Sequence, residues 1–236
     1  MFKIALNAGH YKYTAGRRCS KEFDPNETSE WTLNDRIADK VEKLLSKNYT
    51  GYELIRTDDT EGEKKIDLNA RTTAANNFGA DFYLSIHHNG GIKGGKGGGI
   101  VAYVYTDVDK ETLAWQKDLY NSLIEATGLR GNRSSPMPRQ NFHELRETKM
   151  PAVLLELGFM DSATDAPIII TEEYADRCAI AIANVIAKRG NLEVKPVAKG
   201  PLYRVQVGAF SKREYAEHVL KALQADGYTN AYIKEE

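Results

Sequence analysis

The sequence predicts an α/β fold in which helices cover both faces of a sheet, followed by a small C-terminal unit. Short apolar runs of strand length alternate with longer segments of helical periodicity up to about residue 190. Hydrophobic residues make up 42% of the 236 positions, which is enough for a sizeable core. The pattern breaks after Gly190, and one alternating and one helical segment follow.

Strands and helices are expected in turn before residue 190. The strand candidates are apolar runs bounded by turn residues, at 2–6, 52–56, 82–87, 100–105 and 152–156. The helix candidates carry apolar residues at helical spacing, at 30–47, 68–78, 110–127 and 172–188. In the first helix Glu30 extends an apolar stripe formed by Leu33, Ile37, Val41, Leu44 and Leu45.

Two loops and a linker interrupt this pattern. Residues 90–99 read GGIKGGKGGG, and residues 131–140 combine glycine, prolines and arginines. Both are expected to be surface loops near a site, although a disordered hairpin turn is an equal alternative for the first. Residues 191–201 hold two prolines without periodicity, which predicts a linker between a domain at 1–190 and a unit at 202–236.

The C-terminal unit is expected to be a strand, a helix and a second strand. Tyr203, Val205 and Val207 alternate with Arg204 and Gln206, as in a strand with one buried face. A capping box and the apolar face of a helix follow, at Ser211, Glu214, Ala216, Val219, Leu220 and Leu223, with Gly227 as the C-terminal cap. Two strands and one helix bury too little surface to be stable alone, so this unit needs a partner.

The charge balance favours neither nucleic acid nor a membrane as partner. The net charge is −1, from 32 basic and 33 acidic residues, without a basic stripe. No apolar run approaches the ~20 residues of a membrane span. The N-terminus lacks the features of a signal peptide, so we expect synthesis in the cytoplasm without one. Cys19 and Cys178 are expected to be reduced.

Two polar residues stand where an α/β sheet binds its ligands. His10 follows the first strand, and such ligands bind at the carboxyl ends of strands. Glu30 opens a helix on its core-facing side, where a buried carboxylate must be paired or bind metal. Each has an ordinary alternative, which is a hydrogen-bonded structural histidine for His10 and stabilisation of the helix dipole for Glu30.

Two further strands end in polar residues at the same edge. His87 and His88 close the third strand and point to opposite faces, so only one of them converges with His10 and Glu30. We choose His87 because it continues the strand directly, which leaves His88 facing solvent or supporting the site. Two histidines and one carboxylate with an open fourth position match a catalytic zinc site.

Glu156 ends the apolar run of the last strand, where a buried acid needs a partner. The ordinary alternative is a salt bridge to Arg146 or Arg71. As a functional group, Glu156 would be a general base and acid beside an activated water.

At these residues the sequence strongly resembles the zinc-dependent N-acetylmuramoyl-L-alanine amidases of the autolysin and phage endolysin group. The resembling segments are NAGH, SEWTLN, LNARTTAANNFGADFYLSIHHN and FHELRETKMPAVLLELGFMDS. The resemblance implies a twisted, mostly parallel, six-stranded sheet, with zinc held by His10, Glu30 and His87 and with Glu156 as the essential acid and base. It also implies hydrolysis of the amide between N-acetylmuramic acid and the L-alanine of the peptidoglycan stem peptide.

The stretch at 202–236 resembles one half of a SPOR repeat, a module that binds peptidoglycan glycan strands. Arg204 and Gln206 are the candidate glycan contacts. Related autolysins carry two such halves, so the single half here leads us to expect a homodimer that pairs two tails. The alternative is a tail that packs on its own catalytic domain.

Substrate contacts are expected from Asn89 and Arg146, and from Arg133 or Arg139 in the second loop, whereas Arg71 is expected to be structural. Two rival functions stay open: a noncatalytic cell-wall binding protein, and a zinc peptidase that cuts within the stem peptide. As an endolysin or autolysin, the protein is expected to reach the wall after release by a holin or by lysis of the host cell.

Overall fold

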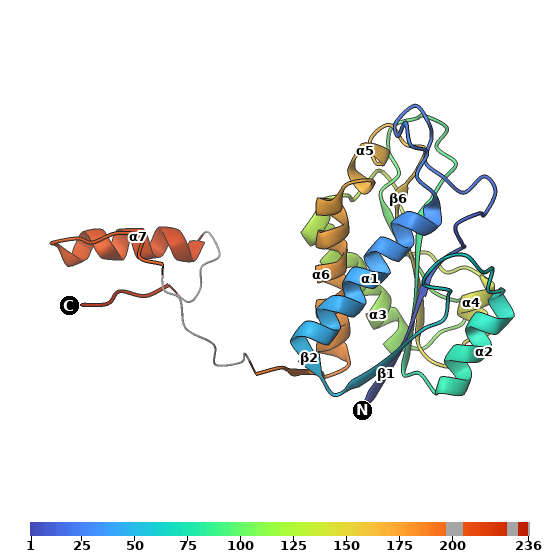
Figure 1. The fold of residues 1–236 in the computed structure, drawn as a ribbon, viewed down its shortest axis with the longest axis horizontal. Coiled ribbons are helices and arrows are strands. Elements are labelled where there is room, and N and C mark those ends of the chain that lie inside the picture. The colour runs from blue at the N-terminus through green and yellow to red at the C-terminus, as the bar shows by residue number, and fades with distance from the viewer. Residues whose placement is uncertain (197–204, 226–230, 236) are drawn as a thin grey trace. The chain divides into compact units, whose positions relative to one another are not determined.

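The structure is a computed structural model that describes residues 1–196, 205–225 and 231–235. The chain divides into two compact units, Met1–Lys195 and Pro196–Glu236 (Figure 1). The first unit contains a five-stranded sheet in the order β3-β1-β4-β6-β5. Its strands are β1 (Phe2–Ala8), β3 (Tyr52–Arg56), β4 (Phe82–Asn89), β5 (Ile100–Tyr103) and β6 (Ala152–Phe159). Within this sheet only β5 is antiparallel to its neighbour, which confirms the mostly parallel arrangement.

Helices cover both faces of the sheet because successive side chains of a strand point to opposite sides. Leu6 and Leu84 join a large core with residues of α1 (Glu30–Asn48), α3 (Lys110–Thr127) and α6 (Glu172–Arg189). Ala5 and Tyr83 point the other way and join a smaller core with residues of α2 (Leu68–Phe78) and α4 (His143–Arg146). The short helix α5 (Ala166–Ile169) packs against β6.

The helices begin and end where local side-chain chemistry sets them. Ser29, Asp67, Asp109 and Thr171 each cap a helix by accepting a hydrogen bond from a backbone N–H of its first turn. Gly79 and Gly128 end α2 and α3 in the left-handed conformation that glycine adopts without strain. The four helices predicted before residue 190 are therefore confirmed, with bounds that differ by at most one residue.

The expected count of six strands is wrong for the described residues, where the sheet has five. The position beyond β5 is filled by the segment 136–140. Ala102 N–H donates to Pro136 O (3.0 Å), and Gln140 N–H donates to Val104 O (2.8 Å). Pro136 and Pro138 have no N–H to donate, so a regular ladder cannot form there.

A second, two-stranded sheet joins β2 (Tyr49–Thr50) to β7 (Glu193–Val194) in antiparallel fashion. The residues that follow α6, up to Lys195, therefore belong to the first unit. No helix in the described parts of the chain is long and apolar enough to cross a membrane.

The second unit contains α7 (Arg213–Ala225), and its partly buried positions are Ala216, Val219, Leu220 and Leu223, as the predicted apolar face requires. The expected flanking strands are not present in the described residues 205–210 and 231–235, which carry no ladder. Val205 is 88% exposed, so the predicted burial of one strand face is also wrong at that residue. Tyr203, Arg204 and Gly227 lie outside the described residues.

The glycine-rich loop at 90–99 is held by side-chain hydrogen bonds, which favour a defined loop over the disordered alternative. The carboxylate of Asp161 accepts hydrogen bonds from the backbone N–H of Gly91 (2.9 Å), Ile92 (3.2 Å) and Lys93 (2.8 Å). The loop also lies against the second loop, because a Cβ added to Gly131 would stand 2.1 Å from the carbonyl oxygen of the neighbouring Gly98.

Candidate active site

Three of the predicted site residues converge beyond the carboxyl ends of the strands. One nitrogen each of His10 and His87 and one oxygen of Glu30 lie within 4.8 Å of one another. His10 Nε2 is 3.1 Å from Glu30 Oε2, and His87 Nδ1 is 3.1 Å from Glu30 Oε1. The two imidazole rings are nearly perpendicular, with centroids 5.1 Å apart. The structure thus brings together the set that the sequence predicts.

The turn after β1 delivers His10 in a conformation that the neighbouring residues must hold. His10 has φ 69°, in the left-handed region that costs a non-glycine residue ~1 kcal/mol or more. The buried guanidinium of Arg71 donates to the carbonyl oxygens of Ala8 (2.8 Å) and His10 (2.5 Å). The side chain of Asn34 donates to Gly9 O (3.1 Å). Arg71 is therefore structural, as predicted.

Gly9 allows His87 to approach this turn. A Cβ on Gly9 would stand 2.0 Å from His87 Cε1, well inside any real contact. The ring of His87 therefore occupies the space that any other residue at position 9 would need.

Glu30 is the buried centre of the cluster, with 1% of its surface exposed. Its Oε2 has no hydrogen-bond partner, although His10 Nε2 lies 3.1 Å away, because the two atoms are not aligned for a hydrogen bond. Burial opposes its ionisation, but the two histidines outweigh burial and hold the pKa of Glu30 well below its ordinary value. A buried carboxylate that faces two imidazole nitrogens and has one oxygen without a hydrogen-bond partner fits a divalent metal ion.

His88 lies on the opposite face of β4, as the alternation argument predicts. It is buried, and its Nδ1 is 2.8 Å from Asn34 Oδ1 on α1. Burial lowers the pKa of His88 to about 3, so it is neutral. The solvent-facing option is wrong because α1 covers β4 to its end.

Glu156 stands beside the cluster on the same face of the sheet. In the ladder between β4 and β6 it is the direct partner of His87. Burial is the main reason that its pKa rises to about 7; His87 lowers it and Glu30 raises it further. Its Oε2 has no hydrogen-bond partner.

The salt-bridge alternative for Glu156 is wrong among the described residues. Arg146 instead donates to Asn141 Oδ1 (2.6 Å) and pairs with Glu147 (2.7 Å). Arg71 is engaged at the turn after β1.

Two residues near the cluster were missed by sequence reasoning. Glu144, from α4, is buried and places its Oε2 3.7 Å from His87 Nε2. Arg17, from the loop after His10, places its guanidinium 3.9 Å from Glu30 Oε2. Neither lies in a periodic segment, since α4 is only four residues long and the loop has no regular structure. The one signal that could have indicated Glu144 is its carboxylate in a short helix between two predicted elements.

The weaker substrate candidates divide into two groups. Arg139 donates to Thr106 O (3.2 Å) and Arg146 is paired on α4, so both already have protein partners. Asn89 ends β4. The guanidinium carbon of Arg133 lies 4.7 Å from the ring centre of Phe159. The positive charge of Arg133 partly offsets the rise in the pKa of Glu156 that burial causes. In the tail, Gln206 is exposed and Arg204 lies outside the described residues.

Comparison with known proteins identifies two families in this chain. The sequence profile of the N-acetylmuramoyl-L-alanine amidase family matches residues 4–188. That of the SPOR domain matches residues 175–235, and so begins within α6.

The relatives and solved structures agree with the first match. A sporulation-specific N-acetylmuramoyl-L-alanine amidase of Bacillus subtilis is 34% identical over 99% of this chain and 85% of its own length. The amidase CwlM of Bacillus licheniformis is 30% identical over 97% of this chain and 83% of its own. The catalytic domain of CwlV, an N-acetylmuramoyl-L-alanine amidase from Bacillus (Paenibacillus) polymyxa var. colistinus, superposes with a TM-score of 0.68 at 27% identity, over 82% of this chain and all of that one.

Proposed function

The chain belongs to the N-acetylmuramoyl-L-alanine amidase family. On this basis we propose that it hydrolyses the amide between N-acetylmuramic acid and L-alanine with a zinc ion held by His10, Glu30 and His87. Glu156 is the proposed general acid and base. The chain is a peptidoglycan hydrolase by its family. The observation that carries the proposed chemistry is the convergence of two imidazole nitrogens and one carboxylate oxygen of Glu30 within 4.8 Å, with Glu30 Oε2 left without a hydrogen-bond partner.

Each residue of the site has a separable task. His10, Glu30 and His87 would hold the metal and leave one side of it open to substrate. When bound, zinc supplies a Lewis acid that polarises the amide carbonyl and brings the pKa of a water molecule towards ~7. Glu156, whose own pKa is raised to about 7, would accept a proton from the attacking water and return it to the departing amine nitrogen of L-alanine.

Substrate contacts are proposed for the residues that surround Glu156. Arg133 and Arg17 each carry a guanidinium whose charge acts on Glu156, and both are candidates to meet a carboxylate of the stem peptide, with Arg17 also 3.9 Å from Glu30 Oε2. Asn89, at the end of β4, places its side chain on the same edge, where its Oδ1 accepts from the backbone N–H of Gly90 (2.8 Å). Arg139 and Arg146 are weaker candidates because each already has a protein partner.

The test is mass spectrometry of digested peptidoglycan with purified variants. The wild type should release stem peptides that start with unmodified L-alanine and leave the glycan strands intact. Glu156→Gln should bind zinc but release no peptide, and His10→Ala should lose both zinc and activity. Glu53→Gln, which changes an exposed carboxylate on β3, is the matched control and should behave as the wild type.

The rival functions predict different products. A zinc peptidase would cut within the stem peptide, and a noncatalytic wall-binding protein would release nothing. Wild-type rates from Glu156→Gln would overturn the role assigned to that carboxylate. Membership in the N-acetylmuramoyl-L-alanine amidase family favours hydrolysis of the amide between N-acetylmuramic acid and L-alanine over both rivals.

For the tail we propose attachment to peptidoglycan and pairing with the tail of a second copy. The match to the SPOR family supports the first part. Exposed apolar side chains of the second unit support the pairing of two tails. They include Val205, Val207, Phe210, Tyr215 and Tyr232. Light scattering should give the mass of a dimer for the full chain and of a monomer for residues 1–196; a monomeric full chain would contradict the pairing.

A further inference from the structure

A buried polar network lies beneath His87, on the side away from Glu30. Asn7 of β1, Ser85 of β4 and Glu144 of α4 are each exposed by 5% or less. Tyr83 donates its hydroxyl to Glu144 Oε1 (2.6 Å), and Asn7 Nδ2 donates to the same oxygen (2.9 Å). Burial of the Glu144 carboxylate is costly unless hydrogen bonds or a nearby positive charge stabilise it. The mechanism proposed above does not use this carboxylate.

Arg71 fixes the direction of donation at Asn7. A guanidinium can only donate. Arg71 Nη1 lies 2.6 Å from Asn7 Oδ1, so that oxygen must be the acceptor, and the amide nitrogen of Asn7 therefore faces Ser85 and Glu144. Asn7 Nδ2 donates to Ser85 Oγ at 2.8 Å.

Ser85 passes this direction on to His87. Its hydroxyl accepts from Asn7, and its single proton can go to Glu144 Oε1, at 3.4 Å. In that arrangement it offers a lone pair to His87 Nε2, at 3.1 Å. The negative charge of Glu144, whose Oε2 lies 3.7 Å from the same nitrogen, favours the same arrangement. Both neighbours of Nε2 thus favour a proton on it.

We propose that Glu144 is a positioning residue, which with Ser85 and Asn7 keeps the proton of neutral His87 on Nε2 and leaves Nδ1 free to bind the metal. This inference rests on the proposed metal role of His87. It agrees with the geometry of the other nitrogen, since Nδ1 is the atom that faces Glu30 Oε1. A carboxylate that fixes the tautomer of a ligating histidine also increases its basicity towards the metal.

The main rival is a purely structural role, in which Glu144 only attaches α4 to the sheet. Glu144→Gln separates the two because it keeps the size of the side chain. The glutamine oxygen would still accept from Tyr83 and Asn7, so its NH₂ group would turn towards His87. A donor there favours a lone pair on Nε2 and a proton on Nδ1, which is the tautomer that cannot bind metal through Nδ1.

Zinc affinity of the full chain is the first measurement, by titration against a competing chelator. We expect Glu144→Gln to bind zinc about 10- to 100-fold more weakly than the wild type. The matched control is Glu147→Gln, which changes an exposed carboxylate directly after α4 and should leave the affinity unchanged. Circular dichroism of the zinc-free proteins should give the same spectrum for all three. Wild-type zinc affinity in a folded Glu144→Gln protein would overturn the proposal.

A second measurement needs no variant. Nitrogen-15 NMR of the histidines in the zinc-loaded wild type should find the His87 proton on Nε2. A proton on Nδ1, or ligation through Nε2, would overturn the proposal even if Glu144→Gln failed to fold. A wild-type protein that binds no zinc would instead refute the proposed metal site, and this inference with it.

Discussion

Gly9 is the residue on which the contact between the end of β1 and His87 depends. We expect Gly9→Ala to displace the His87 ring, because the new Cβ would stand 2.0 Å from Cε1. A shift of ~1 Å in a catalytic group lowers activity by about 100-fold. Gly90→Ala is the matched control, since its Cβ would meet nothing closer than 4.0 Å. Release of soluble peptide from peptidoglycan measures both; equal rates would contradict the steric argument.

The two thiols give a prediction that is independent of the active site. Cys19 and Cys178 are free and buried, and burial raises the pKa of each to about 12. Neither should react with a thiol reagent at pH 8 in the native protein, and both should react in denaturant. A native thiol that reacts within seconds would contradict this expectation.

The raised thiol pKa values also predict how stability changes in alkali. The pKa of a thiol in the unfolded chain lies near its ordinary value of 9.0, whereas the folded thiol stays protonated up to about 12. Between these values the folded chain binds more protons, so the free energy of unfolding falls as pH rises. The slope is about 1.4 kcal/mol per pH unit for each thiol. Urea titrations of wild type and Cys178→Ala from pH 9 to 11 measure it, and equal slopes would count against it.

Residue by residue, the site was predictable where a strand end exposes a polar side chain. His10, His87 and Glu156 follow apolar runs of the sequence, and Glu30 lies on a periodic helix face. Glu144 could not be predicted in this way, because a four-residue helix has no periodicity that would indicate which face is buried. The partner of His88 likewise depends on where α1 crosses β4, which no local pattern encodes.

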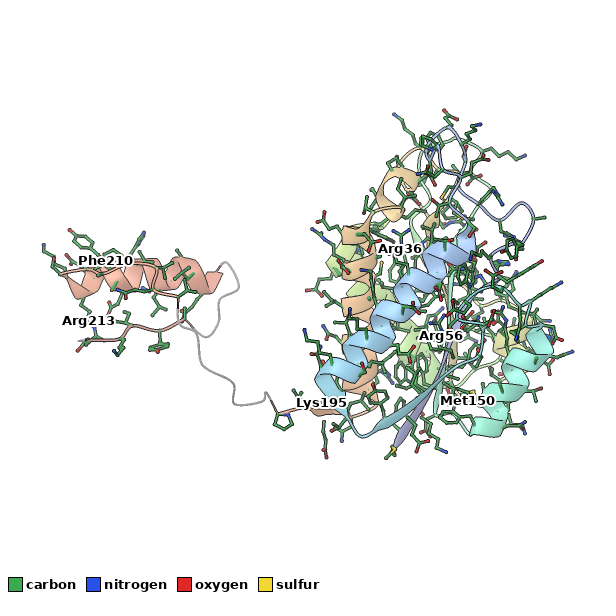
Figure 2. All side chains as sticks on the ribbon, viewed as in Figure 1. Arg36, Arg56, Met150, Lys195, Phe210 and Arg213 are labelled. Carbon is green, nitrogen blue, oxygen red and sulfur yellow. The ribbon has the colours of Figure 1, made fainter. Side chains whose placement is uncertain are left out.

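At the scale of elements, Arg56 joins β3 to α1 (Figure 2). Its guanidinium donates to Asp58 (2.6 Å), Asp35 (2.6 Å) and Asp39 (2.6 Å). Asp58 has a fully buried side chain and also accepts from the backbone of Ala8, near the turn that carries His10.

Removal of this arginine should destabilise the first unit strongly. Arg56→Gln would leave buried carboxylates without their cation, which costs about 3–5 kcal/mol. Arg177→Gln removes an exposed arginine paired with Glu173 along α6 and should cost less than about 0.5 kcal/mol. Urea unfolding of each variant measures the difference through the midpoint of the transition. A midpoint for Arg56→Gln within the error of that of Arg177→Gln would show that the carboxylates find other partners.

The elements that sequence predicted well are those with strong local signals, such as the capped helices α1 and α3. The errors lie at the sheet edge and in the tail. The segment 136–140 runs along β5, but its prolines remove the donors that a strand needs. Residues 205–210 have the alternation of a strand but no neighbouring strand among the described residues, and alternation alone cannot supply one.

At the scale of the whole molecule, the two units should separate hydrolysis from attachment. A chain that ends at residue 196 contains the complete site and both cores of the first unit. We expect it to release soluble peptide from solubilised peptidoglycan at the rate of the full chain. It should bind insoluble peptidoglycan more weakly in a pelleting assay, because the SPOR match extends to residue 235. Equal pelleting of both chains would contradict this role of the tail.

The hydrogen bonds of the glycine-rich loop have a consequence for anions. Successive backbone N–H groups in a glycine- and lysine-rich turn form a concave site that commonly binds phosphate. Here Gly91, Ile92 and Lys93 already direct their N–H groups to Asp161, so a carboxylate of the protein fills that position. A phosphate-bearing polymer would have to displace Asp161 to bind there, and the loop is thereby closed to the ligand that its composition suggests.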